Sequence, residues 1–260
     1  MPEVVQLQTI DNVRDLGGIA VAGNRAVKRG LLFRGSALAG LSDGDAEELF
    51  VRRGVARVID VRCGWERAEK PDVDIPGVEN LHIPFYDLDI VGIEYTEPAE
   101  GTKVVGRDVA CDPDRFYRKL ANPLTVGQMR QAVAAAFESA AAEKPVYMHC
   151  SGGKDRAGIL ALLLLTVLGA SREAILDDYL ITNVARDKNY ERTFQRFLKF
   201  AEGDEQRARE LTEAHRARPE NLAAFYEAVD EAYGSMDDFV RNQLGIDDSL
   251  REQLRTSCTE

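Results

Sequence analysis

The alternation of apolar and polar residues predicts strands that lead into helices. Short apolar runs rich in β-branched and aromatic residues lie at 56–61 and 145–149, and such runs are typical of buried strands. Apolar residues recur at helical spacing over 155–168 and 219–233, and a glycine follows each segment, as is common where a helix ends. This order favours an α/β fold with a central, mostly parallel sheet flanked by helices.

Four further segments carry helix signals. Residues 42–52 are expected to form one helix, with Ser42 as N-cap and Asp45 at the capping-box position. Thr125 is expected to open a second helix, and residues 171–183 form a third. Residues 186–218 are expected to form one highly charged helix with an apolar face. The 260 residues, 45% of them hydrophobic, suit one substantial core, and we expect a single domain over 1–260.

The segment between the strand at 145–149 and the helix at 155–168 is the most informative part of the chain. It consists of His149-Cys150-Ser151-Gly152-Gly153-Lys154-Asp155-Arg156-Ala157-Gly158. Because the segment lies at a helix N-terminus, its unpaired N–H groups and the helix dipole favour a bound anion. Two adjacent glycines let the backbone curl close to that anion without a Cβ clash. The segment therefore predicts a socket for a phosphate-sized anion.

Cys150 and Arg156 are the residues of this socket suited to covalent chemistry. The amide dipoles and the Arg156 guanidinium favour the thiolate of Cys150 over its thiol, and a thiolate facing a bound phosphate is a nucleophile aimed at phosphorus. The planar, always charged guanidinium of Arg156 can hold two phosphate oxygens. Phosphoryl transfer depends mostly on positioning and electrostatics, so the predicted chemistry needs no metal.

Two other interpretations of the segment fit less well. A cysteine and an arginine six positions apart occur by chance, and a buried cysteine is usually a small apolar side chain. Here, however, the pair coincides with a strand, a helix and two glycines. A Walker-type nucleotide loop would need glycine where the chain has Met148 and Ser or Thr where it has Asp155. The catalytic interpretation is therefore favoured over both.

The sequence HCSGGKDRAG resembles the signature of cysteine-dependent protein tyrosine and dual-specificity phosphatases. Its Lys154-Asp155 pair is similar to the bacterial tyrosine-phosphatase-like group with the pattern HCxxGKDRTG. The resemblance covers most of the chain. It extends to NVRDLGG at 12–18, LFRGS at 32–36, VIDVR at 58–62 with Glu66, and the segment 226–254.

The resemblance implies the cysteine-dependent phosphatase fold, with residues 186–260 as a helical lid and C-terminal bundle. It implies that Cys150 is the nucleophile, that a phosphocysteine intermediate forms and is hydrolysed, and that Arg156 is the phosphate clamp. The implied substrates are phosphotyrosine, phosphoserine, phosphothreonine and phosphoinositides, with no cofactor and no metal. The substrate-binding set is Ser151, Gly152, Gly153, Lys154, Ala157 and Gly158, and the supporting set is His149, Asp60 and Arg62.

Three aspartates compete for the role of general acid, which protonates the leaving group. Asp87 begins an acidic segment after the apolar run 80–85 and matches the usual acid candidate of the family, so it leads; a solvated loop charge is the alternative. Asp155 is suited either to act as the acid or to fix Lys154. Asp60 is expected to be a structural partner for a loop arginine. Lys154 is expected to contact an extra phosphate or to supply positive potential.

Three other positions leave questions open. The family usually has Thr or Ser where this chain has Ala157, and that hydroxyl hydrogen-bonds the cysteine sulfur. We expect either slower hydrolysis of the intermediate or a substitute role for Ser151. Tyr179 and Tyr190 are suited to stacking on a substrate ring, although such residues more often pack in a core.

Charge and cysteine content narrow the partners. The formal net charge of −11 argues against nonspecific binding to nucleic acid or anionic membranes, so the expected partner is a phosphorylated protein or a phosphoinositide substrate. The cysteines Cys63, Cys111, Cys150 and Cys258 show neither metal spacing nor a disulfide framework. No targeting signal and no apolar run long enough for stable membrane insertion is found. We therefore expect a cytoplasmic protein, although some members of the family are exported without a signal.

Two functions from other classes stay open. A phosphate-binding module with little turnover would keep the socket and lose the acid. A sulfur-transfer or arsenate-reducing enzyme would also place a cysteine in an anion loop, but the Lys154-Asp155 pair and the C-terminal resemblance argue against it.

Overall fold

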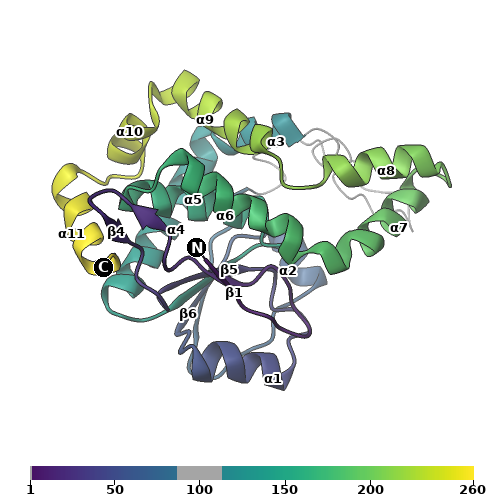
Figure 1. The fold of residues 1–260 in the computed structure, drawn as a ribbon, viewed down its shortest axis with the longest axis horizontal. Helices are drawn as coiled ribbons and strands as arrows, with labels where there is room; N and C mark the ends of the chain where they lie inside the picture. The colour runs from purple at the N-terminus through teal and green to yellow at the C-terminus, as the bar shows by residue number, and fades with distance from the viewer. Residues whose placement is uncertain (1, 87–112) are drawn as a thin grey trace.

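The computed structural model describes residues 2–86 and 113–260. Its centre is a sheet (Figure 1). The sheet has six strands in the order β1-β2-β5-β8-β6-β7. Strands β5, β8, β6 and β7 pair in parallel, whereas β1 and β2 add an antiparallel edge. The strands are β1 (Glu3–Val4), β2 (Arg14–Asp15), β5 (Leu32–Gly35), β6 (Arg57–Asp60), β7 (Glu79–His82) and β8 (Val146–His149). A separate hairpin pairs β3 (Ala20–Val21) with β4 (Arg25–Ala26).

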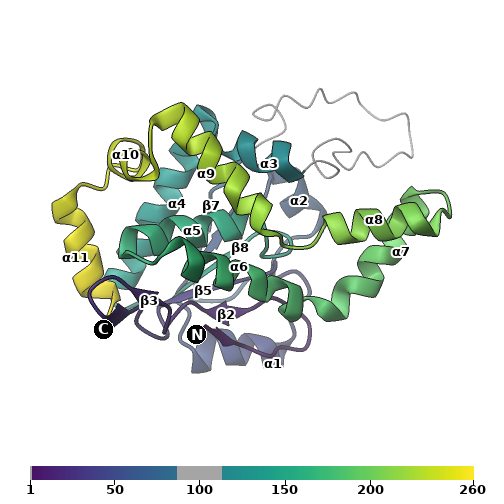
Figure 2. The same cartoon turned by 45° about the horizontal axis from the view of Figure 1, so that its top comes forward.

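Helices cover both faces of the sheet (Figure 2). Side chains alternate along a strand, so neighbouring residues enter different cores. Leu32 and Ile59 belong to the cluster formed with α4 (Pro123–Ala141), α5 (Arg156–Leu168) and α11 (Asp248–Cys258). Phe33 and Val58 belong to the opposite cluster, with Leu49 of η1 (Glu47–Arg52), which continues α1 (Asp43–Ala46). The predicted fold class, a mostly parallel sheet flanked by helices, is confirmed.

The core fixes the position of the segment that joins β8 to α5. All residues of α5 except Thr166 are buried, so this helix lies inside the molecule rather than on its surface. It ends at Gly169, which adopts the left-handed conformation with a φ of 91°. The strand β8 pairs on both sides, with β5 and β6. The loop between these two elements therefore leaves the carboxyl edge of the sheet from a rigid base.

One predicted helix start and one predicted capping box differ from the structure. Helix α4 begins at Pro123 with Asn122 as its N-cap, and Thr125 is buried within its first turn. Proline suits the first helical position because it has no N–H of its own that would lack a partner there. Ser42 does cap α1, but Asp45 does not complete a capping box. The Asp45 carboxylate instead accepts hydrogen bonds from the backbone of Gln8 and Thr9.

The single charged helix expected over 186–218 is wrong. The structure divides this region into η2 (Asp187–Asn189), α7 (Tyr190–Phe200) and α8 (Glu205–Ala214). Gly203 interrupts the helix with a φ of 92°, and Asp204 then caps α8. The turn lets Phe194, Phe197 and Leu211 pack into a small cluster of their own, and α7 and α8 extend away from the sheet (Figures 1 and 2).

The remaining described helices lie both before and after β8 in the chain. They are α2 (Gly64–Glu69), α3 (Pro113–Leu120), α6 (Arg172–Ala185), α9 (Pro219–Tyr233), α10 (Met236–Asp238) and η3 (Phe239–Gln243). Within the described ranges, no helix combines the length and apolar character that a membrane span requires. A single domain with residues 186–220 as a lid stays a prediction.

Candidate active site

The loop between β8 and α5 folds tightly around its two glycines. Gly153 has a φ of +66°, and a Cβ at this position would lie 2.4 Å from the carbonyl of Gly35. A Cβ on Gly152 would lie 2.7 Å from a guanidinium nitrogen of Arg186. Neither position therefore accepts a larger side chain without movement of its neighbours. Cys150, at the start of the loop, is 2% exposed.

Hydrogen bonds hold the carbonyl groups of the loop. The backbone N–H of Ala37 donates to the Ser151 carbonyl, at 3.4 Å. The Asn12 side chain donates to the Gly152 carbonyl at 3.0 Å. Arg34 donates through Nη2 to the carbonyls of Gly153, at 2.7 Å, and Lys154, at 3.0 Å.

These contacts also orient the N–H groups of the loop. In a trans peptide the N–H points opposite to the C=O of the same unit. The amides of residues 152–155 therefore point away from the bracing residues. Among residues 2–86 and 113–260, no group accepts a hydrogen bond from these four amides. The loop thus presents a set of unpaired donors to one side, which is the geometry of an anion site.

A buried ion-pair cluster supports the bracing residues. Asp178 of α6 accepts hydrogen bonds from Arg14 Nε and Arg34 Nη1, both at 2.7 Å. Arg14 in turn donates to the Asn12 side chain at 2.6 Å. Burial alone would raise the pKa of Asp178, but the two arginines outweigh it and lower that pKa. The residues at 12–18 and 32–36 that resemble the family thus lie directly behind the loop.

Arg156 is oriented by Glu66. Its Nη2 donates to Glu66 Oε1 at 2.8 Å, and its Nη1 donates to Glu66 Oε2. The Glu66 carboxylate also accepts from the Ser151 hydroxyl, at 2.5 Å, and from the Cys63 backbone, at 3.0 Å. Burial opposes the ionisation of Glu66, but the bonds from Arg156 prevail and lower its pKa from 4.5 to about 2. The Tyr86 ring lies 5.1 Å from the guanidinium carbon.

Lys154 and Asp155 form a second charged pair, of which Lys154 is buried and Asp155 is partly exposed. Lys154 is 5% exposed, so it is not a surface lysine, and its Nζ donates to the carbonyl of His215. The same Nζ lies 3.3 Å from Asp155 Oδ1, which also accepts from the Tyr117 hydroxyl at 2.5 Å. Burial lowers the pKa of Lys154. Burial would raise the pKa of Asp155, but the Lys154 ammonium and its other partners hold it below its ordinary value.

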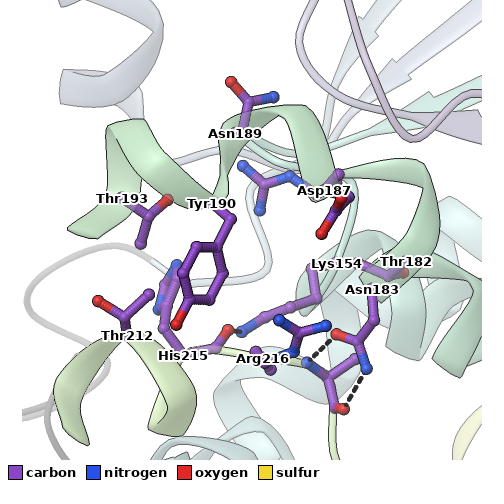
Figure 3. Close-up of a pocket in the computed structure, with 12 residues that line it drawn as sticks. Lys154, Thr182, Asn183, Asp187, Asn189, Tyr190, Thr193, Thr212, His215 and Arg216 are labelled. Carbon is purple, nitrogen blue, oxygen red and sulfur yellow. Dashed lines mark hydrogen bonds between the residues drawn. The ribbon is translucent and has the colours of Figure 1, made fainter. Parts of the chain in front are cut away.

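A small cavity of about 50 Å³ adjoins Lys154 (Figure 3). Its walls come from α6, η2, α7, α8 and the segment after α8, and Arg186, His215 and Arg216 contribute basic side chains. Burial, together with the Lys154 ammonium, lowers the pKa of His215 to about 3, so its ring is neutral at physiological pH. Lys154, Arg186 and Arg216 nevertheless place basic side chains beside the loop, although the chain as a whole has a net charge of −11.

The supporting residues lie beneath the loop. Asp60 is 4% exposed, and both of its oxygens accept hydrogen bonds from Arg62, which also donates to Asp72 at 2.7 Å. Asp60 is thus the partner of a loop arginine, as expected. His149 Nε2 lies 3.2 Å from Asp72 Oδ2.

The carboxylates of Asp60 and Asp72 and the His149 ring lie close enough together to hold a metal ion. Arg62, however, already places its positive charge between these two carboxylates, and a divalent cation would have to displace it. The donor set therefore fits a charge-balanced support better than a metal centre.

The remaining expectations concern single residues. Asp87 lies outside the described residues. Ala157 is fully buried, and the Ser151 hydroxyl donates to Glu66 rather than to the Cys150 sulfur. Tyr179 is only 1% exposed and belongs to the core, which agrees with the packing role and excludes stacking on a substrate ring. Gly158 opens α5 against Arg34 and Tyr179, where a Cβ would lie 3.0 Å from the guanidinium.

Sequence reasoning missed the partners that hold the site together. Asp178 carried one signal, a carboxylate on the buried face of an amphipathic helix. Tyr117 and Asn221 carried none, because Tyr117 contacts Asp155 from a helix 38 positions away and Asn221 contacts Tyr179 rather than the loop itself.

Comparison with known proteins agrees with this geometry. A model of the tyrosine phosphatase family matches residues 5–260. A protein of Cupriavidus necator named as a tyrosine-protein phosphatase is 30% identical over 92% of this chain and 83% of its own length. The triple specificity protein phosphatase PtpB of Mycobacterium tuberculosis is 28% identical over 94% of this chain and 95% of its own.

Solved structures show weaker overall likeness. The catalytic domain of the PP-IP phosphatase SIW14 from S. cerevisiae has 12% identity and a TM-score of 0.35, covering 69% of this chain and 78% of that one. TpbA from P. aeruginosa has 18% identity and a TM-score of 0.33, covering 80% and 96%. The assignment therefore depends on the sequence matches, which extend over nearly the whole chain: this chain belongs to the tyrosine phosphatase family and is a phosphatase.

Proposed function

We propose that this enzyme hydrolyses phosphate monoesters through a phosphocysteine intermediate on Cys150. The observation that carries the proposal is the set of unpaired amides at 152–155, between a buried cysteine and an arginine held in place by Glu66. Amides and a guanidinium together match the charge and geometry of the equatorial phosphate oxygens. No metal is needed for this stabilisation.

The reaction has two steps. The Cys150 thiolate attacks phosphorus, the bond to the leaving oxygen breaks, and the general acid protonates that oxygen. Water then attacks the phosphocysteine, the phosphorus–sulfur bond breaks, and inorganic phosphate and the thiolate are released. Arg156 and the loop amides hold the phosphoryl oxygens in both steps.

Asp87 is the proposed general acid. The support is indirect: Asp60 is fully engaged by Arg62, and Asp155 is held in its ionised form, which cannot donate a proton. Asp87→Asn should therefore slow hydrolysis of substrates with poor leaving groups far more than that of substrates with good ones. An equal loss with both kinds of substrate would move the acid role to Asp155.

The proposed substrates are phosphotyrosine, phosphoserine or phosphothreonine in proteins, and phosphoinositides. The similarity to a relative named a triple specificity phosphatase supports a broad range. A panel of phosphopeptides and phosphoinositides, compared by kcat/KM, separates protein from lipid substrates. We also propose a cytoplasmic location, because Cys150 works only when reduced.

The direct test is phosphate release from a small aryl phosphate by the wild type and Cys150→Ser. We expect turnover only in the wild type, together with trapping of radioactive phosphate on Cys150 after rapid quenching. A protein that binds orthovanadate yet releases no phosphate would be a binding module instead. Consumption of thiosulfate without phosphate release would indicate a sulfur-transfer enzyme.

A further inference from the structure

A buried row of hydrogen bonds leads from the C-terminal helices to the phosphatase loop. Tyr117 of α3 donates to Asp155 Oδ1 at 2.5 Å. The Tyr117 and Tyr179 hydroxyls lie 2.7 Å apart, and Asn221 of α9 donates to the Tyr179 hydroxyl at 2.8 Å. Tyr117 and Tyr179 are each 1% exposed, and Asn221 is 2% exposed. The row thus joins three helices to one residue of the loop, shielded from solvent.

The protons in this row have only one consistent arrangement. An ionised carboxylate only accepts hydrogen bonds, so the Tyr117 hydroxyl must donate its single proton to Asp155. The Tyr117 oxygen must then accept a hydrogen bond from the Tyr179 hydroxyl, which leaves Tyr179 with no further proton to donate. The Tyr179 oxygen must therefore accept from an amide N–H of Asn221, as the geometry shows. Three successive donors point toward Asp155, and such chains strengthen one another in a low-dielectric interior.

Asp155 is the acidic end of this row, and the two tyrosines do not ionise at or below neutral pH. Burial raises the pKa of both tyrosines above the ordinary value, so the two hydroxyls stay protonated donors. The ionisable groups that act on Asp155 from the loop and the elements around it are Lys154, Arg156, His215, Tyr117, Tyr179 and Tyr86. The pKa of Arg156 is raised, so its charge is constant in this range; burial lowers the pKa of Lys154, and His215 titrates only near pH 3.

The two oxygens of Asp155 have different surroundings. Oδ1 receives both the Tyr117 hydroxyl and the approach of the Lys154 ammonium. In the part of the chain that the structure describes, Oδ2 accepts no hydrogen bond, and the side chain is 28% exposed. Oδ1 is thus held by hydrogen bonding inside the protein, while the carboxylate as a whole is still accessible to solvent.

We propose that Tyr117, Tyr179 and Asn221 are positioning residues that act through Asp155, forming a one-way relay that holds this carboxylate in its charged, active form. The inference rests on the proposed function and adds residues to the same site. Ionised Asp155 fixes the Lys154 ammonium beside the loop. Helices α3, α6 and α9 thereby set the charge balance of a loop to which they contribute no residue.

The test is the pH profile of kcat/KM for a small aryl phosphate. Loss of the Tyr117 hydroxyl makes Asp155 harder to ionise, so activity should require a higher pH. Tyr117→Phe should move the acidic limb upward by about one pH unit, the size expected for one hydrogen bond to a charged group. Tyr179→Phe should move it in the same direction by less, because it removes a donor one step away.

Tyr233→Phe is the matched control. Its hydroxyl, also on the C-terminal helices, donates to the Ala121 carbonyl at 2.9 Å and does not join the row. This control should leave the limb in place. In an Asp155→Asn background, Tyr117→Phe should produce no further movement of the limb, because the relay acts only through Asp155. An acidic limb that stays in place in Tyr117→Phe, or moves equally in Tyr233→Phe, overturns the proposal.

A second readout does not depend on catalysis. Asp155 has a folded-state pKa below its unfolded value, so its contribution to stability is present at neutral pH and is lost as the pH falls. The Tm difference between the wild type and Tyr117→Phe should therefore stay constant from about pH 7 to about pH 5 and narrow as the pH falls further and Asp155 protonates. For Tyr233→Phe the difference should stay constant. A constant difference for Tyr117→Phe overturns the relay, whereas absent phosphate release by the wild type overturns the proposed function alone.

Discussion

Replacing Glu66 by glutamine tests how much the orientation of Arg156 contributes. The pKa of Glu66 falls from 4.5 to about 2 in the folded protein, and this difference corresponds to about 3 kcal/mol in favour of the ionised state. Glu66→Gln keeps the shape but removes the charge and one of the two bonds to Arg156. We expect the unfolding free energy to fall by about 2–3 kcal/mol at neutral pH. With Arg156 less well oriented, kcat/KM should fall by about 10²-fold.

The assay combines urea unfolding with steady-state hydrolysis of an aryl phosphate. Because the folded-state pKa of Glu66 is depressed, its contribution is present above pH 4.5 and is lost as the pH falls toward 2. The stability gap between wild type and Glu66→Gln should close over that window. Glu79→Gln is the control, since Glu79 makes a similar contact with Arg57 on the surface and should cost less than about 1 kcal/mol. Unchanged kcat/KM in Glu66→Gln would refute the reasoning.

Three other substitutions test the support of the loop. Gly153→Ala should lose most activity and at least about 1 kcal/mol of stability, because its Cβ would strike the carbonyl of Gly35; unfolding and kinetic measurements check this. Asp178→Asn should cost about 3–5 kcal/mol in urea unfolding, since it leaves two buried arginines without their shared carboxylate. His215→Gln should reduce the loss of Tm as the pH falls from about 6.5 to 3. In this range the unfolded chain binds a proton at His215 while the folded protein, with its depressed pKa, does not, so the wild type loses stability as the pH falls.

Local patterns predicted the elements whose causes are local. Helix α5 was visible from its apolar run and from Gly169, which caps it. Helix α6 was visible from its N-cap Ser171. The break between α7 and α8 was missed because helical spacing of Phe194 and Phe197 outweighed a single glycine in the pattern. The turn at Gly203 lets α7 and α8 pack against each other. This contact joins residues too far apart to be seen in a short window of sequence.

The same distinction applies to the site. Cys150 and Arg156 are six positions apart, so the predicted strand, loop and helix already place the two side chains at the same anion site. The partners that orient them are remote: Glu66 lies 90 positions from Arg156, and Asp178 lies 144 positions from Arg34. Periodicity shows that a residue is buried, but it does not show which distant charge it meets. The resemblance marked Glu66 and Arg34 as notable, and only the structure shows what they contact.

The pairing of Arg156 with Glu66 favours phosphate binding rather than competing with it. A guanidinium carries five N–H donors in a fixed plane, and Glu66 takes one from each terminal nitrogen. The remaining donors keep a defined direction before any substrate arrives, because the plane cannot rotate while both bonds hold. Arg34 fixes the loop amides in the same way by binding their carbonyls from behind. Since both groups of donors are held in advance, little reorganisation is needed when charge develops on the phosphoryl oxygens.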